Sequence, residues 1–550
     1  LADMRASGIL LQQEPLEQRV GTCWRCKTPI EIMSERQWFV KICPDEIMKA
    51  AREVAWSPEH MFLRMENWVE QMEWDWCISR QRLFATPIPV WSCTQCGEMI
   101  VPDEADLPID PTRDRPKVRC PKCGSTEFSG EADVLDTWMD SSISVLNVTG
   151  WTGEGVPPLF PAELRPQGHD IIRTWAFYTI LRAVALTGKR PWDRILVNGM
   201  VLGEDGFKMS KSRGNIISPE EIVEKHGADA LRQWGAAGAT TGSDIMFNWN
   251  DVVAASRFQT KLWNIARFAL LQLERKPFDP EAPITAMADR WLMVRLGDTV
   301  TEVTSAMDAC QFDRALKAIR EFAWDILADN YIELVKGRLY ADDSSRDGAC
   351  RALSTALDTL CRLVAPFTPH FAEECYSYLR KGSVHASSWP VMENEDSEAR
   401  NDGDLLVKVV SELRRYKHEK GMALNAPMGR LAVYSSPVHD DGGDAARALN
   451  ACEVLWHADP PNLEKVPGDV QFNMAIVGKT LRKEAPAFMK AIRALTPEEQ
   501  QDPPESVDIG EKRVPVPPGS FSLQYHYLEA GEKVDLLTLD DVTVTIHPTS

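Results

Sequence analysis

Two lysines that lie three positions apart are the residues of this chain best suited to chemistry. Lys208 and Lys211 belong to the stretch EDGFKMSKSRGN, where Gly206 and Gly214 bound a loop that follows the strand-like run 195–202. Ammonium groups on such a loop can bind the β- and γ-phosphates of ATP and stabilise the charge that grows on the pyrophosphate leaving group. The alternative is a charged surface turn, and the bare motif does not decide between the two.

Two Cys-x-x-Cys pairs, each followed by glycine, predict a metal site. Cys93 and Cys96 form the first pair, and Cys120 and Cys123 form the second. Glycine can adopt the positive φ that turns backbone N–H groups toward the sulfurs, and four thiolates make a closed tetrahedral zinc site. A redox pair or buried free thiols are the alternatives. Because four sulfurs leave no coordination position open, we expect this zinc to be structural.

A third pair, Cys23 and Cys26, has the same spacing but no second pair close by. It is either half of a zinc site whose other ligands lie elsewhere or a buried thiol pair without metal. The thirteen cysteines of this long chain include clustered pairs, which favours metal over a disulfide framework.

A possible nucleotide contact lies where an extended segment gives way to a helix. The stretch QGHDIIRTWAF contains Gly168 and Asp170, and the helix that follows is predicted to end near Gly188. In doubly wound sheets a glycine followed by an acid at such a turn binds nucleotide, with the acid accepting from ribose hydroxyls. By spacing alone Asp170 could equally be a helix N-cap.

Composition and charge are those of an ordinary globular protein. The 550 residues, 44% hydrophobic and 26% charged, suggest about three to four domains. The formal net charge of -20 argues against binding nucleic acid by general electrostatics, although 211–213 and 413–420 are locally basic; the second could also be a solvated helix face. We find no apolar run that could span a bilayer and no signal peptide, so we expect a cytoplasmic protein that does not enter membranes.

The hydrophobic pattern predicts three kinds of structure along the chain. Residues 131–202 alternate strand, loop, helix and strand, as in a parallel α/β sheet. From about 253 to 382 apolar residues recur at helical spacing, which predicts a helical bundle with Trp263, Trp324 and Phe367 in its core. An acidic stretch at 392–404 is predicted to be a linker to a last α/β region.

Five motifs follow one another in this chain: DWCISRQRLFATPIPVW, VLDTWMDSS, QGHDIIRTWAF, NGMVLGEDGFKMSKSRGN and KLWN. Together they resemble class I aminoacyl-tRNA synthetases of the valyl, isoleucyl and leucyl subgroup, and within it the archaeal-like valyl enzymes. The resemblance covers about residues 1–430. It implies ATP-dependent ligation of valine to tRNA through valyl-adenylate, with ATP and Mg²⁺, valine and tRNA(Val) as partners and structural Zn²⁺ as a cofactor.

The resemblance also assigns roles to single residues. Lys208 and Lys211 would be the catalytic lysines that act on the triphosphate. Trp138 would form one wall of the valine pocket and Phe84 another, although the family often has Trp-Gly where this chain has Phe84 followed by alanine. The ATP-binding residues would be Gly168, Asp170, Met209, Ser210 and Lys211.

Two features of the family are absent from this sequence. The His-x-Gly-His motif is not found among the ten histidines, and there is no editing domain. We therefore expect a C-terminal part, either a fragment or a split subunit, that needs an N-terminal half, and that half would supply the missing partners of Cys23 and Cys26. An isoleucyl enzyme and a non-catalytic tRNA-binding remnant are the alternatives.

The resemblance and the hydrophobic pattern together predict a fold. It is the second half of a Rossmann-type catalytic domain of the α/β class with a zinc insert, then an α-helical anticodon-binding bundle and a small C-terminal α/β domain. The predicted boundaries are a connector at 1–20, the catalytic half at 21–252 with a zinc module at 93–130 and the lysine loop at 203–216, the anticodon-binding domain at 253–391, the linker at 392–404 and the last domain at 405–550.

Overall fold

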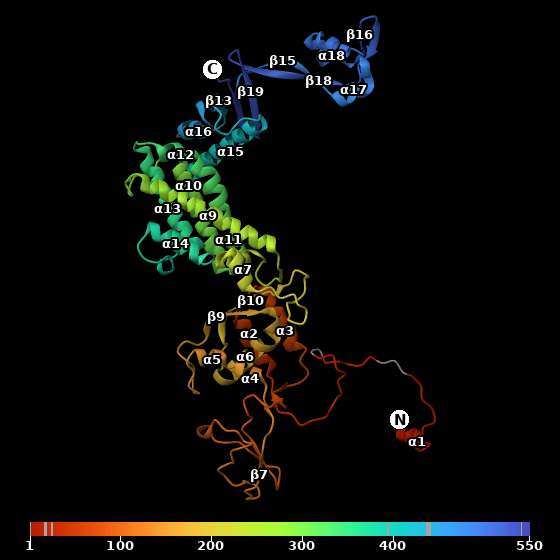
Figure 1. The fold of residues 1–550 in the computed structure, drawn as a ribbon. Coiled ribbons are helices and arrows are strands. Elements are labelled where there is room, and N and C mark those ends of the chain that lie inside the picture. Colours follow the sequence, from red (N-terminus) through yellow and green to blue (C-terminus); the bar gives the residue numbers. More distant parts are fainter. Residues whose placement is uncertain are drawn as a thin grey trace. The chain divides into compact units, whose positions relative to one another are not determined.

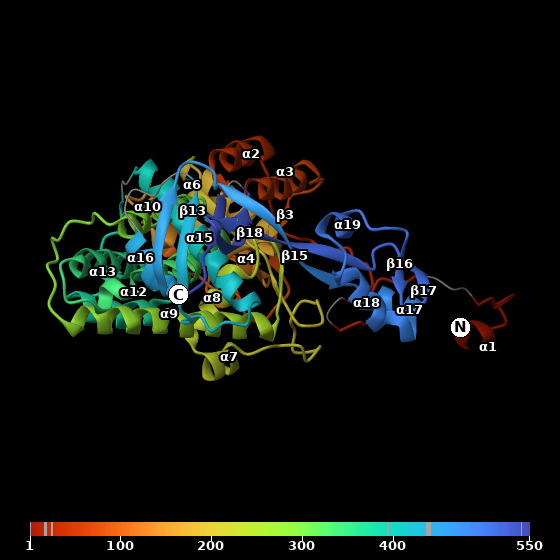
Figure 2. The same cartoon turned by 90° about the horizontal axis from the view of Figure 1, so that it is seen from above.

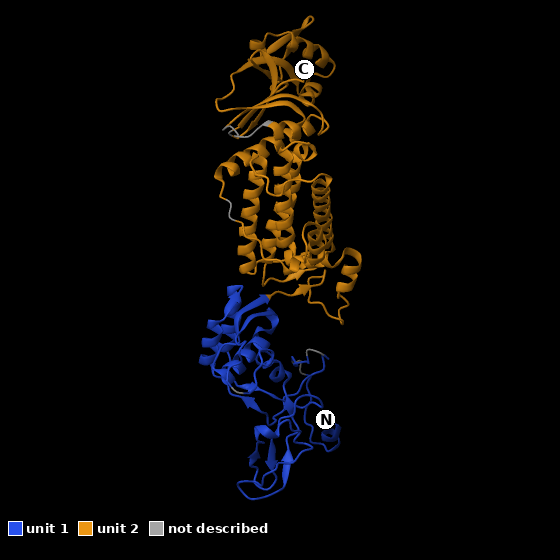
Figure 3. Cartoon of the chain, turned by 90° about the vertical axis from the view of Figure 1, so that its left-hand side faces the viewer, with its two compact units in different colours: residues 1–197 blue, residues 198–550 orange. Residues whose placement is uncertain are grey.

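The computed structural model describes residues 2–15, 19–23, 26–153, 155–392, 395–435, 442–540 and 542–549. The chain forms two compact units, residues 1–197 and 198–550, drawn in blue and orange in Figure 3. The boundary between the units therefore falls inside the predicted catalytic region 21–252 and not at its end.

The expected continuous strand 195–202 is interrupted. It is divided into β10 (Trp192–Asn198) and β11 (Val201–Leu202). A Cβ at Gly199 would lie 1.9 Å from the carbonyl oxygen of Ser243. Glycine is required where two backbones approach this closely, and β11 then pairs in parallel with β12 (Ile245–Met246).

The first unit contains a small sheet with helices around it, as the α/β pattern predicts. Strand β2 (Ala55–Ser57) pairs in parallel with β10, and β9 (Ala162–Gly168) is the other neighbour of β10. Helix α6 (Phe177–Thr187) ends at its C-cap residue Gly188, which has a left-handed φ of 68°, as expected of a helix C-cap. The helices whose apolar residues share this core are α2 (Pro44–Glu53), α3 (Phe62–Glu70) and α6 (Phe177–Thr187), and Figure 1 shows them near β9 and β10.

The second unit contains a helical bundle that has the largest core of the molecule. It is preceded by the lysine loop and by helices α7 (Pro219–His226) and α8 (Ala228–Ala237). Phe367 lies in this core as expected, with 4% of its surface exposed, but Trp263 and Trp324 are 45% and 39% exposed, so their predicted burial is wrong. Trp324 lies at the bundle surface, where its ring stacks on Phe258 at 6.4 Å and contacts the Lys261 ammonium at 4.8 Å. The helices are α9 (Trp249–Arg275), α10 (Met287–Asp308), α11 (Phe312–Glu321), the π-helix Phe322–Tyr331, α12 (Ile332–Tyr340), α13 (Ser345–Val364) and α14 (Pro369–Leu379).

The predicted linker at 392–404 is mostly helix. Helix α15 (Ser397–Glu419) begins within it and packs along α10. Its acids accept hydrogen bonds from side chains of α10. Asp404, for example, accepts from Trp291 Nε1 at 2.8 Å and from Arg295 Nε at 3.1 Å. A Cβ at Gly403 would lie 2.3 Å from the Trp291 ring. The stretch looks like a linker in the sequence because its contacts are made by charged and small residues.

The C-terminal part is an α/β domain, as predicted, but it shares its core with the bundle. Apolar residues of β13 and β20 belong to the same buried cluster as those of α10 and α13. None of the helices in the described part of the chain has the length and hydropathy of a membrane-spanning segment. Helix α16 (Gly442–Leu449) joins β13 (Met428–Tyr434) to its parallel neighbour β14 (Ala451–His457), and the antiparallel strands β20 (Val542–Ile546), β19 (Glu532–Leu539), β18 (Phe521–Glu529) and β15 (Leu463–Phe472) complete the sheet.

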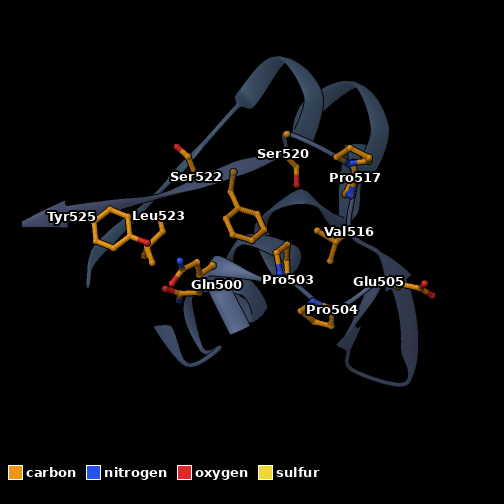
Figure 4. Close-up of a pocket in the computed structure, with 14 residues that line it drawn as sticks. Gln500, Pro503, Pro504, Glu505, Val516, Pro517, Ser520, Ser522, Leu523 and Tyr525 are labelled. Carbon is orange, nitrogen blue, oxygen red and sulfur yellow. The ribbon is translucent and has the colours of Figure 1, made fainter. Parts of the chain in front are cut away.

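A lobe made of residues 473–520 is inserted between β15 and β18. Figure 2 shows these two long strands leading from the sheet to the lobe. It has its own small core and a cavity of about 410 Å³, on which Pro503 and Val516 converge while Glu505 points away (Figure 4). The lobe consists of α17 (Met474–Leu481), α18 (Ala485–Arg493), α19 (Pro497–Gln501), β16 (Ser506–Ile509) and β17 (Lys512–Pro515).

A buried ion network joins the bundle to the C-terminal domain. The Arg338 guanidinium of α12 donates two hydrogen bonds of 2.7 Å to Asp289 of α10, and its Nε lies 3.0 Å from Asp444 of α16. The Tyr331 hydroxyl donates to Asp289 at 2.8 Å. Burial alone would lower the pKa of Arg338, but the two carboxylates raise it. The guanidinium is therefore charged and is held by both parts of the unit.

Replacing Asp289 with alanine is expected to lower the free energy of unfolding of the second unit by about 3–5 kcal/mol, because it leaves a buried guanidinium without its bidentate partner. Urea unfolding followed by tryptophan fluorescence measures this. The control is Glu302→Ala, which removes the more exposed ion pair with Arg314 and should cost about 1 kcal/mol or less. Equal losses in the two variants would contradict the assigned role of the network.

Candidate functional site

The lysine loop is a closed turn fixed to its own unit at both ends. Gly203 donates its N–H to the carbonyl of Phe207 at 2.8 Å, and Lys208 forms a β-bridge with Leu202. Gly206 and Gly214 have φ values of 73° and 69°, a conformation that side chains other than glycine disfavour. The two glycines that bound the motif in the sequence therefore form the two bends of the loop.

A latch inside the loop fixes its shape. Asn215 Nδ2 donates to Asp205 Oδ1 at 3.0 Å, and Asn215 Oδ1 accepts from the backbone N–H of Ser210 at 2.9 Å. The hydrogen bond from Asn215 and that from the Phe207 N–H lower the pKa of Asp205. The sequence motif contains both Asp205 and Asn215, but their pairing across the loop was not predicted.

Met209 anchors the loop, while the two lysines are exposed. The Met209 side chain packs on a small core formed by Ile222, Trp234, Phe247 and Val252. Lys208 and Lys211 are both exposed. Met209 was predicted to bind ATP; in this structure its side chain is used in packing. An anchored loop that presents two ammonium groups to solvent is suited to bind a polyphosphate.

Gly168 and Asp170 lie at the end of β9, in the first unit. Gly168 is the N-cap residue of the short 3₁₀ turn His169–Ile171, and Asp170 is the second residue of that turn. Asp170 is exposed. The N-cap positions are occupied by Gly168 for this turn and by Ile171 for the π-helix Ile172–Ala176 that continues into α6, so Asp170 occupies neither of them.

Trp138 is held at the start of a short helix by a buried carboxylate. Asp136, the N-cap of α4 (Thr137–Ser141), accepts from the Trp138 N–H at 3.2 Å and from Arg80 Nη2 at 2.7 Å. The Trp138 side chain is partly buried against the core of the first unit. Asp136 and Arg80 lie in two of the family-like motifs, but the motifs alone predicted a role for neither residue.

Phe84 is not brought against this core. It lies in a bend with 94% of its side chain exposed. The structure therefore shows no packed second wall at this position, and the role of Phe84 in an amino-acid pocket stays a prediction. A cavity of about 570 Å³ elsewhere in the unit has aromatic walls that were not predicted, including Trp76 and Tyr178, whose rings stack at 3.8 Å.

The four predicted zinc ligands lie together in the insert. Their sulfur atoms are all within 4.8 Å of one another, with 3.5 Å between Cys96 and Cys120 and 3.6 Å between Cys93 and Cys123. Sulfurs around a tetrahedral zinc with bonds of about 2.3 Å are about 3.8 Å apart, whereas a disulfide needs about 2.05 Å. The arrangement fits a four-thiolate metal centre and not a pair of disulfides.

Short strands and tight turns position these sulfurs. The insert is a three-stranded sheet of β6 (Met99–Ile100), β5 (Trp91–Cys93) and β7 (Phe128–Gly130). Gly97 and Gly124 have the predicted positive φ, at 73° and 69°. Burial raises the pKa of the Cys93 thiol, but hydrogen bonds from the backbone N–H groups of Gln95 and Cys96 and from the Cys123 and Cys96 thiols together bring the pKa to about 6, while the neighbouring thiols raise the pKa of Cys96. The turns thus stabilise a thiolate, the form that binds zinc.

The pair Cys23 and Cys26 forms the same kind of turn. The Cys23 N–H donates to the Thr28 carbonyl and the Lys27 N–H to the Cys23 carbonyl, both at 2.8 Å, as the corresponding groups around Cys93 do. Lys27 has the φ of 63° that glycine has in the other two turns. A hydrogen bond with the Thr28 side chain lowers the pKa of Cys26 to about 7. Among the described residues no third ligand joins this pair.

The basic stretch 413–420 has one buried cation, while Arg415, His418 and Lys420 form an exposed side of the helix, as the solvated-face alternative predicts. Lys417 is fully buried, and its ammonium donates to the carbonyls of Leu424, Ala426 and Leu449 at 2.9, 2.6 and 2.5 Å. Lys420 pairs with Asp535 at 3.0 Å. Lys417 is thus used inside the fold, and Lys420 is paired at the surface.

Two family models match the chain. Residues 18–248 match tRNA synthetases class I (I, L, M and V), and residues 289–434 match the anticodon-binding domain of tRNA ligase. The first match includes the lysine loop, Trp138, Asp170 and the zinc insert. The second covers most of the helical bundle and continues through β13.

Curated relatives match the chain along almost its whole length. Valine–tRNA ligases of Methanosarcina barkeri and Methanothrix thermoacetophila are both 51% identical to it, over 99% and 100% of this chain and 64% and 63% of their own. That of Archaeoglobus fulgidus is 52% identical over 91% of this chain and 58% of its own. The chain thus spans less than two thirds of the length of these relatives.

Replacing Asn215 with alanine is expected to loosen the lysine loop, because Ser210 and Asp205 each lose a hydrogen bond. A loss of about 1–2 kcal/mol in local opening would speed amide hydrogen exchange of Ser210 by about 5- to 30-fold. Glu204→Ala, an exposed change in the same loop, is the control. Unchanged protection at Ser210 in the Asn215 variant would show that the latch does not hold the loop.

Cys120→Ser is expected to remove one equivalent of bound zinc per chain and to expose the amides of 91–130 to rapid exchange, since the turns would lose their common ligand. Metal content by mass spectrometry and hydrogen exchange measure the two effects. Cys43→Ser, at an exposed thiol, should leave both unchanged. Full zinc content in the Cys120 variant would contradict the four-thiolate site.

Proposed function

The chain belongs to the class I tRNA synthetase family, and from this premise we propose that it is the catalytic-to-C-terminal part of a valine–tRNA ligase. The complete enzyme would join valine to ATP as valyl-adenylate and then transfer the valyl group to tRNA(Val). The observation that carries the proposal is the identity of 50% or more with valine–tRNA ligases over 99% of the chain. The relatives support valine over isoleucine as the amino acid.

Lys208 and Lys211 would act on the triphosphate. When the valine carboxylate attacks the α-phosphorus, negative charge grows on the pyrophosphate, and ammonium groups that contact it lower the barrier. Mg²⁺ bound to ATP would share this charge. The latch between Asn215 and Asp205 supports this role. Because the latch gives the loop a fixed shape, the loop does not have to be ordered again in each catalytic cycle before the two ammonium groups can act.

Gly168 and Asp170 would contact the ribose of ATP. Gly168 leaves the turn open to a close approach, and the exposed Asp170 carboxylate can accept hydrogen bonds from two vicinal hydroxyls. Met209 and Ser210 would contact ATP through their backbone, since the Met209 side chain is committed to packing.

Trp138 would form an apolar wall against the valine side chain. Its position is set by the buried Asp136, which Arg80 holds by an ion pair of 2.7 Å. Phe84 would pack against the substrate only by moving from its exposed position. An isoleucyl enzyme would need more space at the same wall. Comparing valine with isoleucine in an ATP–pyrophosphate exchange assay distinguishes a valyl from an isoleucyl enzyme.

Zinc and tRNA complete the proposed set of partners. Cys93, Cys96, Cys120 and Cys123 would hold one Zn²⁺ in a closed site, which stabilises the insert and supplies no reaction step. Cys23 and Cys26 would contribute two ligands to a second site. The helical bundle would bind the anticodon region, where the exposed Trp263 and Trp324 rings are candidates for stacking on bases.

Valine-dependent ATP–pyrophosphate exchange tests the proposal. We expect no exchange from this chain alone, because its sequence contains no His-x-Gly-His motif. Exchange should appear when a polypeptide with that motif completes the enzyme, with a higher kcat/KM for valine than for isoleucine. A preference for isoleucine would contradict the valyl assignment, and exchange by the pure chain would contradict the need for a second segment.

In the completed enzyme Lys211→Ala is the informative variant. It should lower kcat by about 10²–10³-fold, as removal of a charge-stabilising donor does elsewhere, with little change in the KM for valine. Lys225→Ala, an exposed lysine paired with Glu221 outside the loop, is the matched control.

A further inference from the structure

The inserted lobe 473–520 has two chemically different halves. Its first half, α17 and α18 with the turn between them, contains five exposed cations and one acid, Glu484, which Lys512 pairs at 3.2 Å. Its second half is rich in acids and surrounds the proline-lined cavity of Figure 4. In a chain with a net charge of -20, the five cations of the first half are a marked local excess of positive charge. We define the basic face as Lys479, Arg482, Lys483, Lys490 and Arg493.

The core of the lobe turns these cations outward. Val477 and Leu481 of α17 and Phe488 and Ile492 of α18 are buried in it. Lys479 lies two residues after Val477, which places it on the side of the helix away from the core. Lys490 and Arg493 lie three positions apart on α18, and residues at this spacing on a helix surface are about 5–6 Å apart, similar to the spacing of phosphates along a strand of RNA. Arg482 and Lys483 lie in the 3₁₀ turn Arg482–Glu484 that follows α17.

Four of the five cations of the basic face have no polar partner among the described residues. In the described part of the chain no side-chain hydrogen bond or ion pair involves Lys479, Arg482, Lys483 or Lys490, whereas Lys417 and Lys420 of the other basic stretch are bonded. Arg493 lies over the ring of Phe472 at 5.4 Å. Four unpaired cations within twelve consecutive residues (479–490) repel one another unless a partner neutralises them.

Gly478 gives a second reason to expect a partner. It lies inside α17, where glycine costs about 1 kcal/mol relative to alanine. A Cβ at this position would have no atom within 4 Å, so packing within the chain does not require glycine. Its exposed backbone, next to Lys479, allows a close approach from outside.

We propose that the basic face of the lobe binds the sugar–phosphate backbone of tRNA, at a contact additional to the anticodon-binding bundle. The cations would neutralise phosphates and release counterions. The face contains no aromatic side chain to stack on bases, so it would read the shape of a helical segment and not its sequence. The inference rests on the proposed function, since it names tRNA as the partner.

Salt-dependent binding of transcribed tRNA with the valine anticodon to the full 550-residue chain tests the inference by fluorescence anisotropy. The variants K479Q/K483Q and K490Q/R493Q should each raise Kd about ten-fold at 0.1 M salt and lower the salt slope by about 2, because each removes two phosphate contacts. The control K512Q/R513Q removes two charges from the other half of the lobe and should change neither value. Thermal melting should be the same in all four proteins.

The outcomes separate this inference from the proposed function. If the wild-type chain binds tRNA and both variants of the basic face bind it equally well, the inference is wrong and the function stands. If the wild-type chain shows no preference for tRNA over heparin, a polyanion of similar charge, both fail. If the control weakens binding as much as the variants, the contact is general electrostatic attraction, and the assignment to the basic face is overturned.

Discussion

The second unit depends on one buried guanidinium. Arg338 could not be buried without partners, because desolvating a charge costs several kcal/mol, and the two aspartates that compensate it come from the bundle and from the C-terminal domain. The apolar core continues across the same region, from α10 and α13 into β13 and β20. Bundle and C-terminal sheet are therefore one cooperative body, and a loose linker between them would separate Arg338 from Asp444.

In each unit the candidate phosphate-binding and metal-binding groups lie in short segments. The lysine loop is anchored by one partly buried methionine and one asparagine latch, and Lys208 and Lys211 are exposed. In the first unit the four clustered cysteines also lie in tight turns, which direct backbone N–H groups at the Cys93 sulfur. Binding groups on short loops over a firm scaffold combine accessibility with fixed geometry.

The charges of this acidic chain are distributed unevenly over its surface. Acids and cations that look unpaired in the sequence are matched in the fold, as Asp404 is with Arg295 and Lys420 with Asp535. The surplus of cations at the basic face and the exposed aromatic rings Trp263 and Trp324 are local exceptions. Local exceptions of this kind, and not the net charge, decide where RNA could bind.

The sequence by itself determined the order of domains, the lysine loop, the four clustered cysteines and the left-handed glycines, because these follow from local spacing and backbone limits. Only the tertiary structure decided that 397–419 is one helix, that Lys417 is buried, that Trp263 and Trp324 are exposed and that Asp205 pairs with Asn215. In each case the partner lies elsewhere along the chain or across a turn, and periodicity within one segment cannot identify it. Motifs thus fix the chemistry of single segments, and packing fixes which of their charges and rings remain available.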